Sequence, residues 1–90
     1  MRPESPIHLE FFGIPRRRAG CEAISVTGRT LRDVLRAAVA AAPGLAELCE
    51  DGCLKAGYAA NRNGREFLAD SDTLLEPGDR VLVFSADLGG

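Results

Sequence analysis

Hydrophobic and polar residues alternate along residues 7–11 (IHLEF), near the start of the chain. A period of two is typical of a half-buried β-strand, because successive side chains point to opposite faces. We therefore expect Ile7, Leu9 and Phe11 to face the core. Phe12 breaks the alternation and is expected on the opposite, more polar face, where a large aromatic ring is available to a partner.

A different spacing follows between residues 30 and 44, where the apolar residues recur along a single helical stripe. They are Leu31, Val34, Leu35, Ala38, Val39 and Ala42. Thr30 is expected to cap this helix, with Asp33 three positions later as in a capping box. Pro43 and Gly44 are expected to end it. We assign the stripe to core packing.

The other segments of the first half have weaker patterns. Residues 13–20 contain two glycines, a proline and three arginines, and are expected to form a loop. Residues 21–26 indicate a strand with Ile24 and Val26 inward, although Cys21, Ala23 and Ser25 would also be tolerated inside. After the helix, residues 45–48 are expected to add one helical turn, and residues 50–52 a chain turn.

From Leu54 the pattern returns to strand, with residues 58–60 as the apolar part. Asn63-Gly64 predicts a hairpin, because both residues accept positive φ, and residues 66–68 follow as a short strand. Leu74 and Leu75 are expected to enter the core. A Pro-Gly turn at residues 77–78 then leads to the strand 80–84, whose four consecutive apolar residues indicate a central position.

These elements predict an α+β domain, a mixed sheet of about five strands with one main helix on one face. If the first and last strands are parallel neighbours, Val81 and Val83 face inward, and Leu82 and Phe84 share the outer face with Phe12. We expect one domain over residues 1–90, with a frayed leader at residues 1–6 and a flexible tail at residues 85–90.

Composition narrows the functional classes. The chain has 90 residues, 46% of them hydrophobic, and a net charge of −2, so we expect no nucleic-acid or membrane partner. The arginines at 16–18 are expected in a solvated loop. No apolar run is long enough to span a bilayer and no signal-peptide pattern is present, which indicates a cytoplasmic protein.

The chain has three cysteines, Cys21, Cys49 and Cys53. A small and odd number of cysteines is a poor basis for a disulfide framework. Cys49 and Cys53 would offer two metal ligands, but the single histidine, His8, is far away in sequence. A four-ligand zinc site is therefore incomplete, and we expect structural or incidental thiols and no metal.

Six residues, 85–90, follow the apolar run 81–84, and the last two are Gly89-Gly90. Glycines have no Cβ, so this end is thin enough to thread a narrow site in another protein. We therefore expect the chemistry at the carboxylate of Gly90, with Gly89 supplying the geometry of the tail.

From residue 7 to Gly90 the chain resembles the ubiquitin-like sulfur carriers of the MoaD and ThiS type. The resemblance is carried by residues 9–12, the helix start at Thr30-Leu31, the turn at residues 77–79, the strand 81–84 and the terminal Gly-Gly. Residues 50–52 and Asn61 resemble the small subunit of molybdopterin synthase. None of these features is specific for the family alone. Their order along the chain, together with the C-terminal position of Gly-Gly, is specific.

The resemblance implies a β-grasp fold and a carrier that is not itself an enzyme. It implies that an E1-like adenylyltransferase of the MoeB or ThiF type uses ATP to adenylate Gly90. A sulfur donor then converts the carboxylate to a thiocarboxylate, a 1-thioglycine, with no stably bound cofactor. A large molybdopterin synthase subunit of the MoaE type is a further implied partner.

The resemblance also implies docking through an apolar patch on the open sheet face. The patch maps to Phe12, Phe67 and Phe84, with Leu82 and Leu88 beside it. The alternative is that these rings complete the core.

The pathway stays open, because the family often has proline in the tail and Thr or Ser before Gly-Gly, whereas here residues 85–88 read SADL. The arginine segment also lacks the common Arg-Glu element. Molybdopterin biosynthesis is the first expectation. The alternatives are thiamine, cysteine or tRNA thiolation, a ubiquitin-like modifier joined through Gly90, and a plain binding module.

Overall fold

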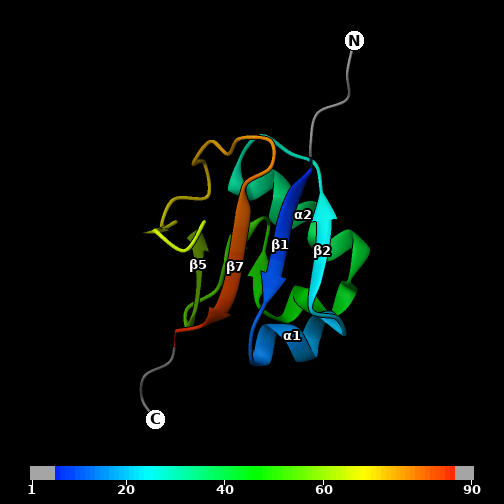
Figure 1. Ribbon diagram of the computed structural model, residues 1–90. Helices are drawn as coiled ribbons and strands as arrows, with labels where there is room; N and C mark the ends of the chain where they lie inside the picture. Colours follow the sequence, from blue (N-terminus) through cyan, green and yellow to red (C-terminus); the bar gives the residue numbers. More distant parts are fainter. Residues whose placement is uncertain (1–5, 87–90) are drawn as a thin grey trace.

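A mixed five-stranded sheet forms one layer of the structure, a computed structural model that describes residues 6–86. Its strand order is β2-β1-β7-β5-β6 (Figure 1). The strands are β1 (Ile7–Phe11), β2 (Ala23–Val26), β5 (Tyr58–Arg62), β6 (Glu66–Phe67) and β7 (Arg80–Ser85). β1 and β7 are parallel, and the other pairs are antiparallel. The predicted mixed sheet with a central last strand is confirmed.

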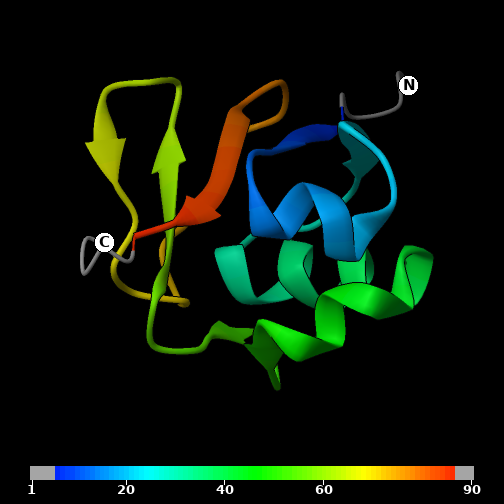
Figure 2. The ribbon, with the colours of Figure 1, turned by 90° about the horizontal axis from the view of Figure 1, so that it is seen from below.

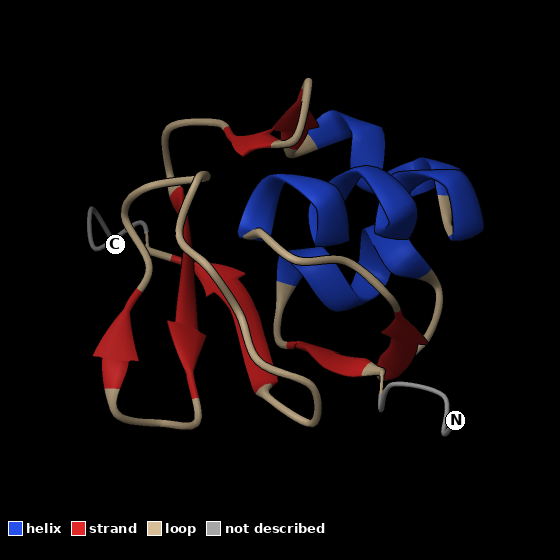
Figure 3. Ribbon diagram, turned by 90° about the horizontal axis from the view of Figure 1, so that it is seen from above, coloured by secondary structure: helices blue, strands red, loops and turns tan. Residues whose placement is uncertain are grey.

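The second layer is helical and covers one face of the sheet (Figure 3). It consists of α1 (Ile14–Ala19), α2 (Leu31–Ala41) and the 3-10 helix η1 (Pro43–Glu47). A small hairpin of β3 (Cys49–Glu50) and β4 (Cys53–Leu54) follows η1. Seen from below, the β5–β6 hairpin stands at the end of the molecule away from the helices (Figure 2).

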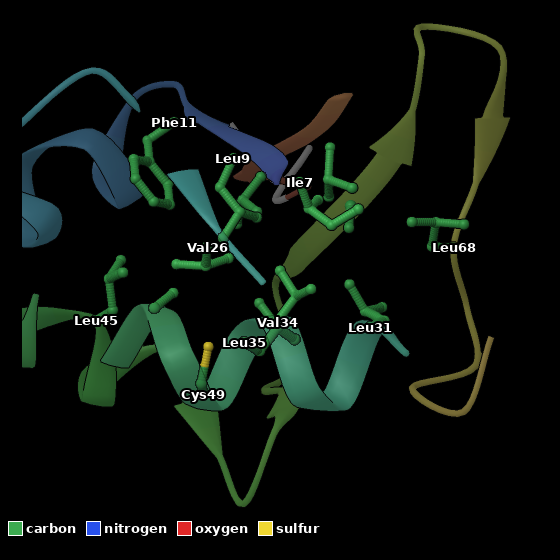
Figure 4. Packing of buried hydrophobic residues seen from close by; sticks show 14 of the residues in the cluster. Ile7, Leu9, Phe11, Val26, Leu31, Val34, Leu35, Leu45, Cys49 and Leu68 are labelled. Atoms are coloured by element: carbon green, nitrogen blue, oxygen red, sulfur yellow. The ribbon is translucent and has the colours of Figure 1, made fainter. Parts of the chain in front are cut away.

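The core lies between α2 and the inward side chains of the sheet (Figure 4). The alternation in β1 is confirmed, because Ile7, Leu9 and Phe11 are at most 1% exposed. The predicted register is confirmed as well, with Val81 opposite Leu9 and Val83 opposite Phe11. Burial of this one face therefore places every second residue of β7 on the other, open face.

Helix α2 begins with the predicted cap. The Asp33 N–H donates to Thr30 Oγ1 at 3.1 Å, and the Thr30 N–H donates to Asp33 Oδ2 at 3.3 Å. Hydrogen bonds from the backbone N–H groups of Arg29 and Thr30 hold the pKa of Asp33 below its ordinary value. The capping box satisfies donors that no helical carbonyl reaches. The predicted end is also confirmed, since α2 stops at Ala41.

The predicted loop at residues 13–20 is wrong, because α1 occupies it. The glycines that favoured a loop are the helix boundaries: Gly13 and Gly20 have φ of 65° and 77°, and the Gly20 N–H donates to Arg16 O. Pro15 fits the first turn, where no N–H is needed. The helix packs tightly on η1, since a Cβ on Gly44 would lie 2.0 Å from the Arg18 carbonyl oxygen.

Smaller differences concern short segments. β2 starts at Ala23 and not at residue 21, and its register places Ile24 and Val26 inward, opposite Leu9 and Ile7. The β3–β4 hairpin was not predicted, although the turn at its tip was.

Leu74 and Leu75 differ in burial, with exposed fractions of 70% and 8%. Only Leu75 is therefore part of the core. Ser85 belongs to β7 and not to the tail. Within residues 6–86, none of the helices is both long and apolar enough to cross a membrane.

Candidate functional site

The open face of the sheet, opposite α2, has a polar half and an apolar half. The polar half lies where β1 and β7 begin. There Ser25 Oγ and His8 Nδ1 are 3.2 Å apart, and Arg80 Nε donates to Glu10 Oε2 at 3.1 Å. Cross-strand pairs explain the grouping, because His8 is opposite both Ser25 and Arg80 in register.

The apolar half, which we call the aromatic face, consists of Phe12, Phe67, Leu82 and Phe84. The rings of Phe67 and Phe84 are tilted by 55° with centroids 6.1 Å apart, a geometry that aromatic pairs favour. Phe67 is 70% exposed, whereas Phe84 and Leu82 are partly buried. Phe67 lies on β6, the edge strand of the described sheet, so only β5 flanks it.

Phe12 follows β1 directly and is 46% exposed. Its backbone N–H donates to Val83 O at 3.0 Å, which holds it beside β7. The predicted outward position of Phe12 is therefore confirmed. Phe12 and Phe67 are not core residues, so the alternative that all three rings complete the core does not hold. The docking role of the aromatic face remains a prediction.

Asn61 adds a polar group to this surface. Its register partners are Leu82 on β7 and Phe67 on β6, so it lies within the aromatic face. Its Oδ1 atom is buried and has no hydrogen-bond partner within the described part of the chain. Because this atom is inaccessible from outside, a donor on a partner reaches it only if the Asn61 side chain turns outward.

The predicted reactive residues Gly89 and Gly90, and the predicted contact Leu88, lie outside the described residues. The chain approaches them through Ser85, the partner of Tyr58 on β5, and through Ala86, whose N–H donates to Gly57 O at 2.8 Å. Because β1 and β7 are parallel, Phe12 and Ala86 follow the same end of the sheet. The aromatic face thus borders the point from which the chain continues to Gly90.

The cysteines do not form a ligand cluster. Cys49 is opposite Leu54 and Cys53 is opposite Glu50, so the two thiols lie on opposite faces of the β3–β4 hairpin. Residues 6–86 contain no group of three or more side chains suited to hold a metal ion. Burial raises the pKa of the Cys49 thiol to about 11.

We expect Cys49 to be alkylated by iodoacetamide more slowly than Cys21 and Cys53 at mildly alkaline pH. The thiolate is the reacting species, and the raised pKa keeps Cys49 protonated while burial restricts access. Peptide mass spectrometry after timed labelling gives the three rates. Equal rates in the folded protein would contradict the expectation, and equal rates in urea are the control.

Arg32, on α2, has a structural role that the sequence pattern does not indicate. Its guanidinium donates to Asp51 O at 3.1 Å, to Ser71 Oγ at 3.1 Å and to Asp72 Oδ1 at 3.3 Å. The hydrogen bond to Asp72 raises the pKa of Arg32. Arg32 therefore joins α2 to the β3–β4 hairpin and to the loop that precedes β7, contacts that sequence periodicity cannot reveal.

Neither a protein-family model nor a curated protein matches the chain. Solved structures do. The Haloferax volcanii HVO 2177 protein is 34% identical, with a TM-score of 0.71 over 100% of this chain and 91% of that one. SAMP1 from Haloferax volcanii is 27% identical, with a TM-score of 0.80 over 96% of this chain and 100% of that one.

A third structure is a complex. It contains subunits 1 and 2 of the molybdopterin-converting factor from Helicobacter pylori, and the match is 22% identical with a TM-score of 0.63. It covers 94% of this chain and 99% of that chain, and at this identity it supports the fold alone. With its five-stranded mixed sheet, its single main helix and these relatives, the chain belongs to the MoaD/ThiS family of ubiquitin-like sulfur carriers.

Proposed function

We propose that the protein carries sulfur on the C-terminal carboxyl group of Gly90, most specifically for molybdopterin biosynthesis. An E1-like adenylyltransferase of the MoeB or ThiF type adenylates Gly90 with ATP. A sulfur donor then produces a 1-thioglycine thiocarboxylate. The observation that carries the proposal is the exposed aromatic face at the end of the sheet from which the chain continues to Gly90.

The aromatic face supports docking because its rings are unusually accessible for phenylalanine. Phe67 and Phe12 are 70% and 46% exposed, and Ile14 in the adjoining α1 is 39% exposed. Full burial of such a side chain contributes roughly 1.5–3 kcal/mol, and aromatic residues are enriched in the buried centres of interfaces. A partner that covers this surface gains apolar contact with these side chains.

The reach of the tail fits such docking. Four residues follow Ala86 in the sequence, and an extended chain of that length spans at most roughly 14 Å. A carrier docked by its aromatic face can therefore place the Gly90 carboxylate up to roughly 14 Å from the end of β7. We assign Leu88 to the same contact with the partner. We propose that Gly89, which has no side chain, lets the chain enter a narrow site of the partner.

The chemistry needs only a carboxylate from the carrier. A carboxylate oxygen attacks the α-phosphate of ATP and pyrophosphate leaves, which forms an acyl adenylate. A sulfur nucleophile then attacks the carbonyl carbon, and AMP leaves with the bonding electrons. Catalytic groups for these steps belong to the partner, so we propose a carrier and not an enzyme.

Two relatives bear on what receives the cargo. Subunit 1 of the molybdopterin-converting factor from Helicobacter pylori forms a complex with subunit 2, which favours a large-subunit partner of the MoaE type for this chain. SAMP1 is described as a small archaeal modifier protein. This relative favours a second candidate function, a protein modifier whose activated Gly90 forms an isopeptide bond with lysines of other proteins.

The test is intact-mass measurement after incubation with ATP, a MoeB-type adenylyltransferase and a sulfide donor. The starting mass first establishes that Gly90 is the last residue of the purified chain. We expect a gain equal to the replacement of one oxygen by sulfur. A chain lacking Gly90, and a chain extended by one serine after Gly90, are expected to show none, because neither presents the carboxylate at the right place.

An unchanged mass would contradict the carrier function, provided that the same enzyme thiocarboxylates its own carrier in parallel. The modifier function predicts, instead, conjugates of higher mass in cell lysate. These conjugates must disappear when Gly90 is deleted.

A further inference from the structure

The basic residues of the chain are almost all arginine. Of eleven Lys and Arg residues, ten are arginine and one is lysine, Lys55. A guanidinium group is not deprotonated in proteins, so arginine does not accept acyl groups under these conditions. The uncharged form of a lysine amine is a nucleophile toward activated carbonyl groups. An activated carboxyl group on this chain therefore has a single side-chain amine within its own sequence.

Lys55 is exposed and lies close to the place where β7 ends. It opens a turn in which the Tyr58 N–H donates to Lys55 O at 3.3 Å and Gly57 has a φ of 94°. Tyr58 is the register partner of Ser85, and Gly57 O accepts the hydrogen bond from Ala86. Figure 1 shows β5 beginning beside the end of β7.

The distances permit contact with the tail. A turn of this kind holds its first and last Cα atoms within about 7 Å, and paired antiparallel residues have Cα atoms about 5 Å apart. The Cα atom of Lys55 is therefore within about 12 Å of that of Ser85. The five residues from Ala86 to Gly90 span up to roughly 17 Å. No ion pair within residues 6–86 engages the Lys55 side chain.

We infer that Lys55 accepts the activated acyl group of Gly90 in the same chain. The Lys55 amine attacks the Gly90 carbonyl carbon, a C–N bond forms, and AMP leaves with the electrons of the C–O bond. The amine nitrogen loses its proton to solvent. The product is an isopeptide loop that no longer accepts sulfur. The inference rests on the proposed activation of Gly90. The reaction removes from the sulfur-transfer cycle any activated carrier that a partner does not hold.

Attack within one chain is favoured over attack between copies. A short tether gives an effective concentration of the order of 1 mM. At a protein concentration of about 10 µM, this value favours the intramolecular reaction by roughly 100-fold. The remaining amine competitor is the α-amino group at the N-terminus of the purified chain, which peptide mapping distinguishes.

The experiment uses the full chain with Gly90 prepared as an alkyl thioester by intein cleavage. In this probe a thiol leaves in place of AMP, and the acyl transfer to nitrogen is the same. We expect a product lighter than the free acid by one water molecule, with a Gly90–Lys55 cross-link in the peptide map. Lys55→Arg is expected to lower its yield at least about tenfold, because it keeps the charge and removes the nucleophile.

A matched control moves the amine without changing the number of lysines. Arg29 lies where β1 and β7 begin, since its carbonyl accepts from Leu75 N–H and it closely follows Val26, the partner of Ile7. The double variant Lys55→Arg/Arg29→Lys is expected to cyclise much less than the wild type. Its lysine is separated from the start of the tail by the length of β7, roughly 17–20 Å, so only a nearly extended tail reaches it.

Equal cyclisation in the Lys55→Arg variant would overturn the inference. So would hydrolysis alone in the wild-type thioester, or cross-linked dimers in place of the monomeric loop. The thioester forms without an activating enzyme, so this result is independent of the thiocarboxylate assay. Failure of the one assay therefore leaves the other interpretable.

Discussion

Replacing Phe84 with alanine is expected to weaken binding of the proposed activating adenylyltransferase by roughly 30- to 1000-fold, or about 2–4 kcal/mol. Phe84 lies on the central strand β7 at the middle of the aromatic face, where its ring contacts that of Phe67. Its removal takes away both its own contact and the support that orients Phe67. Isothermal titration calorimetry with the purified enzyme measures the dissociation constant.

The control for this prediction is His8→Ala, on the polar half of the same face. His8 is exposed and outside the aromatic face, so a change in affinity of less than about threefold is expected. Because Phe84 is partly buried, thermal unfolding must show that the variant is folded. Phe12→Ala, at a more exposed position, is the second variant. If both phenylalanine variants bind like the wild type, the aromatic face is not the docking surface.

Replacing Leu35 with alanine is expected to lower the free energy of unfolding by about 2–5 kcal/mol. Leu35 is 2% exposed and lies in the cluster between α2 and the sheet (Figure 4). The truncation leaves a cavity that the rigid strands β1 and β7 cannot fill. Each kcal/mol lowers the Tm by roughly 4–8 °C in a domain of this size. Urea unfolding followed by circular dichroism gives the free energy directly.

Val39→Ala is the matched variant, on the same helix but at a partly buried position. Its cost should be about 0.5–1.5 kcal/mol, because fewer contacts are lost and less cavity remains. A loss below about 1 kcal/mol for Leu35→Ala would show that α2 does not carry the core in the way described.

The elements that could be predicted are those whose periodicity extends over several residues. The alternation in β1 and the apolar run in β7 determine which face is buried, and a shift of one residue would expose Leu9 and Val81 to water. The capping box at Thr30 and Asp33 is a local interaction, readable from two side chains. The outward position of Phe12 follows from the same alternation.

The missed elements depend on contacts between distant segments. α1 has 6 residues, too few to be stable alone, and it is held by burial of Pro15 and close approach to Gly44. Strands β3 and β4 have two residues each, which is too short for any period. The exposure of Phe67 likewise depends on the edge position of β6, and its place in the site is indicated by the family resemblance alone.

The division of the open face into two halves has a consequence for the direction of docking. A partner surface that fits the aromatic face has only one favourable orientation. After rotation by half a turn, its apolar surface would cover the Glu10–Arg80 ion pair and desolvate both charges without replacing their water contacts. The ion pair thus disfavours the reversed orientation of the partner. In the proposed complex, it favours the arrangement in which the end of β7, and not its beginning, faces the catalytic centre of the adenylyltransferase.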